Sequence, residues 1–249
     1  MDAVQYASYL DILKKELIPA LGCTEPIAVA YAAAKAVQVL GEVPESIQIR
    51  CSGNIIKNAK GAAVPNSGGM KGINAAAVLG AVGGDASKEL EVLESVKASD
   101  REKAAALLTA GICTFSLADT TEKIYIEAHV KKETHSAEVV IAEAHTNIVR
   151  ILKDGQVLCD ELKNGEKSTE ERKELSVRGI LEFADCVRME DIRDVIGRQI
   201  QLNTAISQEG LDNPYGAQIG KTLENAWGGT VAARACARAA AGSDARMGG

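Results

Sequence analysis

The chain has 249 residues, of which 46% are hydrophobic and 3% aromatic, and its net charge is -6 at pH 7. This length allows one large domain or two small ones, and the aliphatic residues suffice for a core of closely packed helices. The acidic balance argues against a nucleic-acid partner, because such proteins present a basic face.

Nothing in the sequence indicates secretion or a membrane. Residues 1–18 are amphipathic and carry Asp2, Asp11 and Glu16, unlike a secretory leader. No apolar run reaches the ~20 residues that a membrane-spanning helix needs. The six cysteines form no CxxC pair, so a disulfide framework is not expected. We therefore expect a cytoplasmic protein without a membrane partner.

The first half of the chain begins with helical patterns and then changes period. Apolar residues at helical spacing predict a helix over 3–18, and a second helix runs from Pro26 to about Leu40. Residues 46–51 alternate as a half-buried strand does. Residues 52–72 are rich in Gly, Asn, Ser and Pro, so we expect a long loop there. Three further helices are predicted at about 73–79, 86–98 and 100–110.

The second half has a β region followed by helices. Alternation predicts strands over 123–130, 137–144 and 147–152, and Asp154-Gly155 is a strong hairpin signal. Asn164-Gly165 is typical of a turn that leaves the sheet. Helical patterns then return in four segments: 169–184, 189–206, 215–226 and 229–241.

These elements predict an α+β fold with an insertion. A helical unit of residues 1–43 and 165–249 would carry an inserted α+β layer of residues 44–164. That layer would contain a mainly antiparallel sheet of about four to five strands. The chain stops at Gly249 directly after a helix, so we expect it to be interrupted rather than finished.

The sharpest chemical signal is Gly-Cys-Thr-Glu-Pro at 22–26, between two predicted helices. The backbone N–H groups and dipole at a helix start stabilise a thiolate, so Cys23 is a candidate metal ligand or nucleophile. A plain buried thiol at a helix corner is the structural alternative.

Other polar residues are candidates for the same site. His145 follows a predicted strand and could act as a general acid or base, or simply be hydrogen-bonded within the sheet. In the 52–71 segment, a substrate carboxylate could contact the side chains of Asn54, Lys57 and Asn58, although a surface connection explains them too. Arg246 could clamp a carboxylate or form a surface salt bridge. Asn147 is a further candidate substrate contact.

Several blocks together resemble the N-terminal part of the L-cysteine desulfidase family, relatives of the iron–sulfur L-serine dehydratase α chain. They are Gly22–Pro26, Lys57-Asn58 with Val64-Pro65, Leu79-Gly80 with Gly83-Gly84, His145–Val149, Leu202-Asn203, Ser207–Leu211 and Ser243–Gly249. The resemblance implies a 4Fe-4S cluster on three cysteines, of which Cys23 matches the first. It implies elimination of sulfide from L-cysteine, giving pyruvate and ammonia. For this reaction we expect His145 to be catalytic, and the candidates Asn54, Lys57, Asn58, Asn147 and Arg246 to bind substrate.

The resemblance places the other two cluster ligands in a C-terminal part that this chain lacks. We therefore expect the chain alone to be free of cluster and inactive, and to need that part or a partner subunit. A homo-oligomer is also expected. Three alternatives stay open: an iron–sulfur L-serine dehydratase, a non-catalytic module that binds a small ligand or assists assembly, and a mononuclear metal site of Cys23 and His145.

Overall fold

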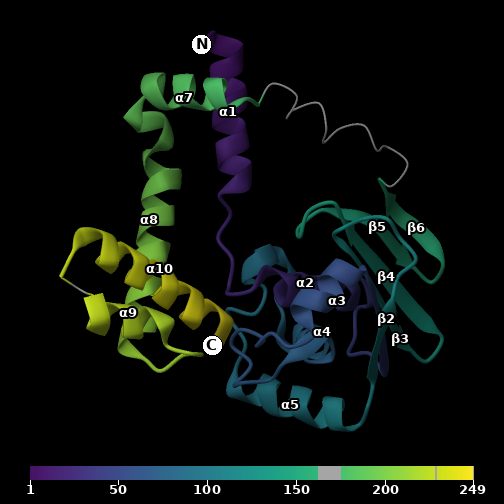
Figure 1. Cartoon of the computed structure of the whole chain (residues 1–249). Coiled ribbons are helices and arrows are strands. Elements are labelled where there is room, and N and C mark those ends of the chain that lie inside the picture. Colours follow the sequence, from purple (N-terminus) through teal and green to yellow (C-terminus); the bar gives the residue numbers. More distant parts are fainter. Residues whose placement is uncertain (162–174, 228, 249) are drawn as a thin grey trace. The chain divides into compact units, whose positions relative to one another are not determined.

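This computed structural model describes residues 1–161, 175–227 and 229–248 (Figure 1). The chain divides into two compact units. The helical unit contains Met1–Pro19 and Lys163–Asp244, and the sheet unit contains Ala20–Leu162 and Ala245–Gly249. Each unit is described by itself below.

A six-stranded sheet organises the sheet unit, in the order β2-β1-β3-β4-β5-β6. The strands are β1 (Ser46–Cys51), β2 (Cys113–Leu117), β3 (Tyr125–Lys132), β4 (His135–Ala142), β5 (Ile148–Lys153) and β6 (Gln156–Asp160). The pair β1–β2 is parallel and all other neighbours are antiparallel. The predicted mainly antiparallel sheet is confirmed. The sheet has more strands than expected because of the short edge strand β2. It pairs only with β1, which is distant in sequence and is not joined to it by a recognisable turn.

This sheet contacts the helices α2 (Thr24–Leu40), α3 (Gly53–Ala59) and α4 (Gly72–Gly83). The 3₁₀ helix η1 (Ala86–Glu91) packs on α2, and α5 (Ala98–Thr109) packs on α4. The α2 helix is buried almost throughout and lies against α4, β3 and β4. A Cβ atom on Gly80 would collide with the backbone of Ala30. The two helices therefore approach more closely than larger side chains would allow.

The predicted long loop over 52–72 is partly wrong, because residues 53–59 form α3. Ser52 starts this helix, since its hydroxyl oxygen accepts a hydrogen bond from the Ile55 N–H at 3.5 Å. The same hydroxyl donates to the Lys123 carbonyl at 2.8 Å. A buried cap of this kind favours a helix in a segment whose composition otherwise suggests a loop.

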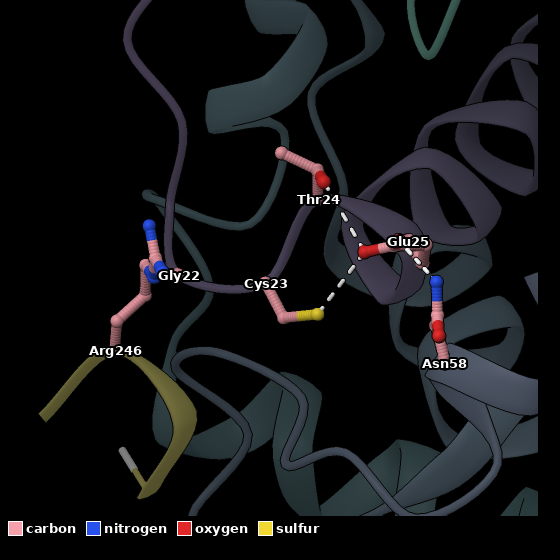
Figure 2. Close-up of a pocket in the computed structure, with 6 residues that line it drawn as sticks. All are labelled: Gly22, Cys23, Thr24, Glu25, Asn58 and Arg246. Atoms are coloured by element: carbon pink, nitrogen blue, oxygen red, sulfur yellow. Dashed lines mark hydrogen bonds between the residues drawn. The ribbon is translucent and has the colours of Figure 1, made fainter. Parts of the chain in front are cut away.

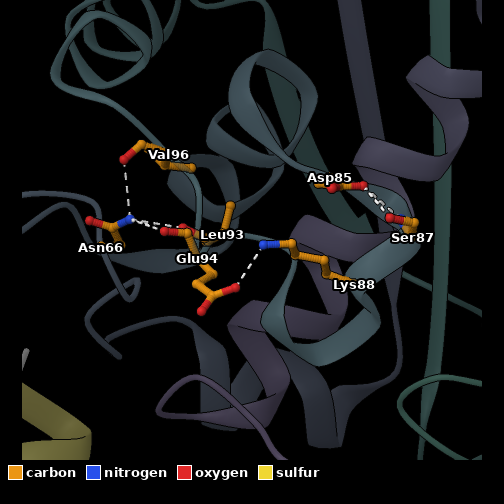
Figure 3. A network of polar contacts seen from close by, with 7 residues as sticks. All are labelled: Asn66, Asp85, Ser87, Lys88, Leu93, Glu94 and Val96. Atoms are coloured by element: carbon orange, nitrogen blue, oxygen red, sulfur yellow. Dashed lines mark hydrogen bonds and ion pairs between the residues drawn. The ribbon is translucent and has the colours of Figure 1, made fainter.

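The remaining loop is fixed by one amide side chain. Asn66 has a φ of 55°. Its Nδ2 donates to the carbonyls of Leu93, Glu94 and Val96 at 2.8, 3.3 and 3.2 Å (Figure 3). Arg101 donates in turn to the Asn66 side-chain oxygen at 3.0 Å. The loop is thereby joined to the segment that links η1 and α5.

The observed division of the chain differs from the predicted one. We expected residues 1–43 to lie with the C-terminal helices, but α2 belongs to the sheet unit. The reason is that buried apolar side chains surround α2, and strands of the sheet supply part of that surface. The other predicted boundary, at 164/165, and the Asn164-Gly165 turn lie outside the described residues.

The helical unit contains α1 (Ala3–Glu16), α7 (Val177–Cys186), α8 (Met189–Asp212), α9 (Ile219–Trp227) and most of α10 (Val231–Gly248). Tyr6 and Tyr9 of α1 pack on Phe183 of α7, with ring centroids 5.5 and 5.7 Å apart. The Tyr6 hydroxyl donates to Asp191 at 2.6 Å. The predicted helices are present, although residues 169–174 of one lie outside the described residues. Within the described ranges, no helix has the length and apolarity to cross a membrane.

Candidate functional site

A cavity of about 330 Å³ opens beside the N-terminus of α2 (Figure 2). It is lined by Gly22, Cys23, Thr24, Glu25, Asn58 and Arg246, all of which belong to the sheet unit. The first four come from the turn before α2 and from its first turn. Asn58 comes from α3, and Arg246 lies in the last turn of α10, which extends beyond its predicted end at 241.

Local backbone geometry places Cys23 at this cavity. Gly22 has a φ of +66°, which strains residues with a side chain. A Cβ atom at Gly22 would lie 2.8 Å from Cγ of Pro65 and 3.2 Å from the carbonyl oxygen of Arg246. Glycine therefore lets the chain turn tightly into α2. Cys23 is then the N-cap residue of α2, and its thiol donates a hydrogen bond to Oε2 of Glu25 at 3.2 Å.

The expectation of an ionised sulfur is wrong for the metal-free protein. Burial, together with the hydrogen bond to Glu25, raises the pKa of the Cys23 thiol to about 11. The Glu25 backbone N–H and the Arg246 guanidinium act in the opposite direction but do not outweigh these effects. Cys23 is therefore a neutral thiol near pH 7. A metal that bound there would have to displace its proton.

Glu25 is the functional candidate that sequence reasoning missed. Its carboxylate accepts hydrogen bonds from Cys23, from Thr24 Oγ1 at 3.2 Å and from Asn58 Nδ2 at 2.8 Å (Figure 2). Burial raises the pKa of this carboxyl, but the hydrogen bonds from Cys23 and Asn58 outweigh burial, so the pKa is lowered overall. Glu25 is thus an ionised group within the cavity wall. Its place in the first turn of a helix could have flagged it, but an ordinary helix-end carboxylate has the same signature.

His145 lies beyond the end of β4 and is not among the residues that line the cavity. Its Nε2 atom is buried and has no hydrogen-bond partner among the described residues. Burial lowers the pKa of the imidazole, and the negative charge of Glu25 opposes that effect. His145 is therefore close enough to the cavity carboxylate to be influenced by its charge.

Three other candidates lie elsewhere. Asn54 and Lys57 are exposed on α3 and do not line the cavity, whereas Asn58 of the same helix does. Asn147 donates its side-chain N–H to the Ala142 carbonyl at 3.1 Å and so supports the turn between β4 and β5. Of the predicted site residues, the structure brings together Cys23, Asn58 and Arg246.

The described residues do not by themselves fit a four-iron cluster. Among them, no group of three or more His, Cys, Asp or Glu side chains could hold a metal ion. Cys51 and Cys113 are buried in strands, and burial raises both pKa values to about 12. Of the cysteines, only Cys23 lines the cavity formed by the described residues. A cluster takes several thiolate ligands, so this part of the molecule offers one of them.

Comparisons with known proteins give relatives over nearly the whole chain. A UPF0597 protein of Lachnoclostridium phytofermentans is 49% identical over 245 residues, which are 98% of this chain and 59% of that protein. UPF0597 proteins of Desulfitobacterium hafniense and Finegoldia magna are 44% and 46% identical, and the chain covers 57% and 58% of them. No protein-family model and no solved structure matches. This chain is therefore similar to UPF0597 proteins and spans a little under three fifths of the length of the curated relatives it matches.

Proposed function

We propose that this chain is the N-terminal part of an iron–sulfur-dependent lyase that converts L-cysteine to pyruvate, ammonia and sulfide. One observation carries the proposal: Gly22–Glu25 of the Gly-Cys-Thr-Glu-Pro segment line a cavity in which the Glu25 carboxylate and the Arg246 guanidinium are both present. A volume of about 330 Å³ is at the small end of ligand pockets, as a small amino acid requires. The resemblance of several sequence blocks to L-cysteine desulfidases supplies the reaction class.

The residues of this chain have separate roles in the proposal. Cys23 is the cluster ligand that this chain contributes, and the remaining cysteine ligands come from sequence beyond it or from a partner subunit. Arg246 binds the substrate carboxylate, because a guanidinium can donate two parallel hydrogen bonds to it. His145 moves a proton near the cavity, since burial keeps its imidazole neutral and able to accept one. Asn58 holds the Glu25 carboxylate in place.

The test uses the longer protein, reconstituted with iron and sulfide under anaerobic conditions. Sulfide and pyruvate are measured with L-cysteine and with L-serine as substrates. Cys23→Ser should abolish both cluster absorbance and turnover, whereas Cys186→Ser, an exposed cysteine outside the cavity, should change neither. Full activity of the Cys23→Ser protein would refute the proposal.

The same assay separates the alternatives. Pyruvate from L-serine without sulfide from L-cysteine would indicate an L-serine dehydratase. Binding of an amino acid without either product would favour a non-catalytic module, and stoichiometric zinc in place of iron would favour a mononuclear site. A cytoplasmic location and a homo-oligomeric assembly are also part of our proposal, and light scattering of the purified protein tests the assembly.

A further inference from the structure

The Glu25 carboxylate lines the cavity and is held there by hydrogen bonds from neighbouring side chains. Oε2 accepts from Cys23 and Thr24, and Oε1 accepts from Asn58. These side-chain donors are all neutral, and Glu25 forms no ion pair within the described residues, so no positive charge among its partners balances the carboxylate. Figure 2 shows Glu25 between Cys23 and Asn58 at the cavity. A ligand group that donates a hydrogen bond and carries a positive charge suits this position.

The charges of the cavity are divided between two places. Glu25 contributes a carboxylate and Arg246 a guanidinium, and Figure 2 shows Cys23 between them in the cavity lining. Arg246 forms no ion pair within the described residues, so its guanidinium is available to an anion. A small ligand with one charge of each sign satisfies both groups, whereas a simple anion or cation satisfies only one.

We propose that Glu25 binds the α-ammonium group of the substrate while Arg246 binds its α-carboxylate, so that the cavity selects free α-amino acids. This inference rests on the proposed function for the identity of the cavity as the substrate site. It adds a specificity: compounds without the amino group, and peptides or acylated amino acids, bind weakly. The selectivity resides in Glu25, because Arg246 contacts the part that all carboxylic acids share.

The experiment compares two ligands that differ only in the amino group. L-serine and 3-hydroxypropionate are titrated into the metal-free 249-residue chain at pH 7, and binding is followed by calorimetry. A hydrogen bond to a charged group contributes about 1.5–3 kcal/mol, so the chain should prefer L-serine by about tenfold or more. Glu25→Gln should remove this preference and leave 3-hydroxypropionate binding unchanged. Arg246→Gln should weaken both ligands.

Glu102→Gln is the matched control, because Glu102 is exposed on α5 outside the cavity. It should retain the preference, and melting temperatures of all variants establish that each is folded. An equal preference in Glu25→Gln and the unaltered chain overturns the inference, as does the failure of the unaltered chain to bind L-serine. Neither result requires a cluster or turnover, so the lyase proposal stands or falls separately in the activity assay.

Discussion

Gly22 allows a direct test of how a single residue shapes the site. Gly22→Ala introduces a Cβ atom 2.8 Å from Pro65, at a φ of +66°. We expect a loss of about 1–3 kcal/mol in the free energy of unfolding, measured by urea denaturation. Gly41→Ala is the control, because Gly41 has a φ of +94° but no atom within 4 Å of the added Cβ. Equal losses in the two variants would show that the contact with Pro65 is unimportant.

The Cys23 thiol makes a prediction about pH. Its pKa is raised from 9.0 to about 11, so alkylation of Cys23 by iodoacetamide, followed by peptide mass spectrometry, should increase up to about pH 11. The pKa of this thiol is higher in the folded than in the unfolded chain. Its contribution to the free energy of unfolding is therefore fully present below pH 9 and is lost as pH rises through about 11. Glu25→Gln should shift the alkylation midpoint to lower pH, since it removes a negative charge. A midpoint at or below pH 9 in the unaltered chain would contradict this account.

At the scale of elements, Asn66 holds a loop against the segment between η1 and α5. Asn66→Gly keeps access to the positive φ but removes the hydrogen bonds of the side-chain amide with the three carbonyls and with Arg101, and should cost about 2 kcal/mol in unfolding free energy. Asn66→Ala should cost more, because alanine adds backbone strain. Denaturant titration of both variants separates the two contributions. Indistinguishable stabilities of Asn66→Gly and the unaltered chain would show that the amide contacts contribute nothing.

For the whole molecule, we expect two levels of local stability. The sheet unit holds the residues in the largest hydrophobic cluster, whereas α8 buries only Gly210 and Leu211 among its described residues. Hydrogen exchange followed by mass spectrometry should therefore show faster amide exchange in α8 than in β3 and β4. Equal protection of α8, β3 and β4 would contradict this prediction. It would mean that the number of buried side chains in α8 does not determine its local stability.

Sequence patterns predicted those elements whose signals are local. The alternation in β1, the Asp154-Gly155 hairpin and the helical spacing around Tyr6 and Tyr9 all correspond to observed elements. The helix α3 was missed because its start depends on the bonds of Ser52, one of which reaches Lys123. The place of α2 was missed because its helical pattern does not indicate which surface covers it.

The candidate site was predictable in part for similar reasons. Cys23 was identified from its motif, and its position at the cavity could be expected from the helix start. The role of Glu25 depends on Asn58, which is distant in sequence and approaches only in the folded chain. The raised pKa of Cys23 also results from burial and from this carboxylate, neither of which a helix-start pattern contains.

The burial of α2 has a consequence for the rigidity of the site. Residues 27–33 are at most 6% exposed, and Gly80 of α4 leaves no room beside Ala30. This helix cannot slide or rotate without disrupting the core. The core behind α2 therefore holds the N-terminus of this helix, with Cys23 and Glu25, as a rigid wall of the cavity.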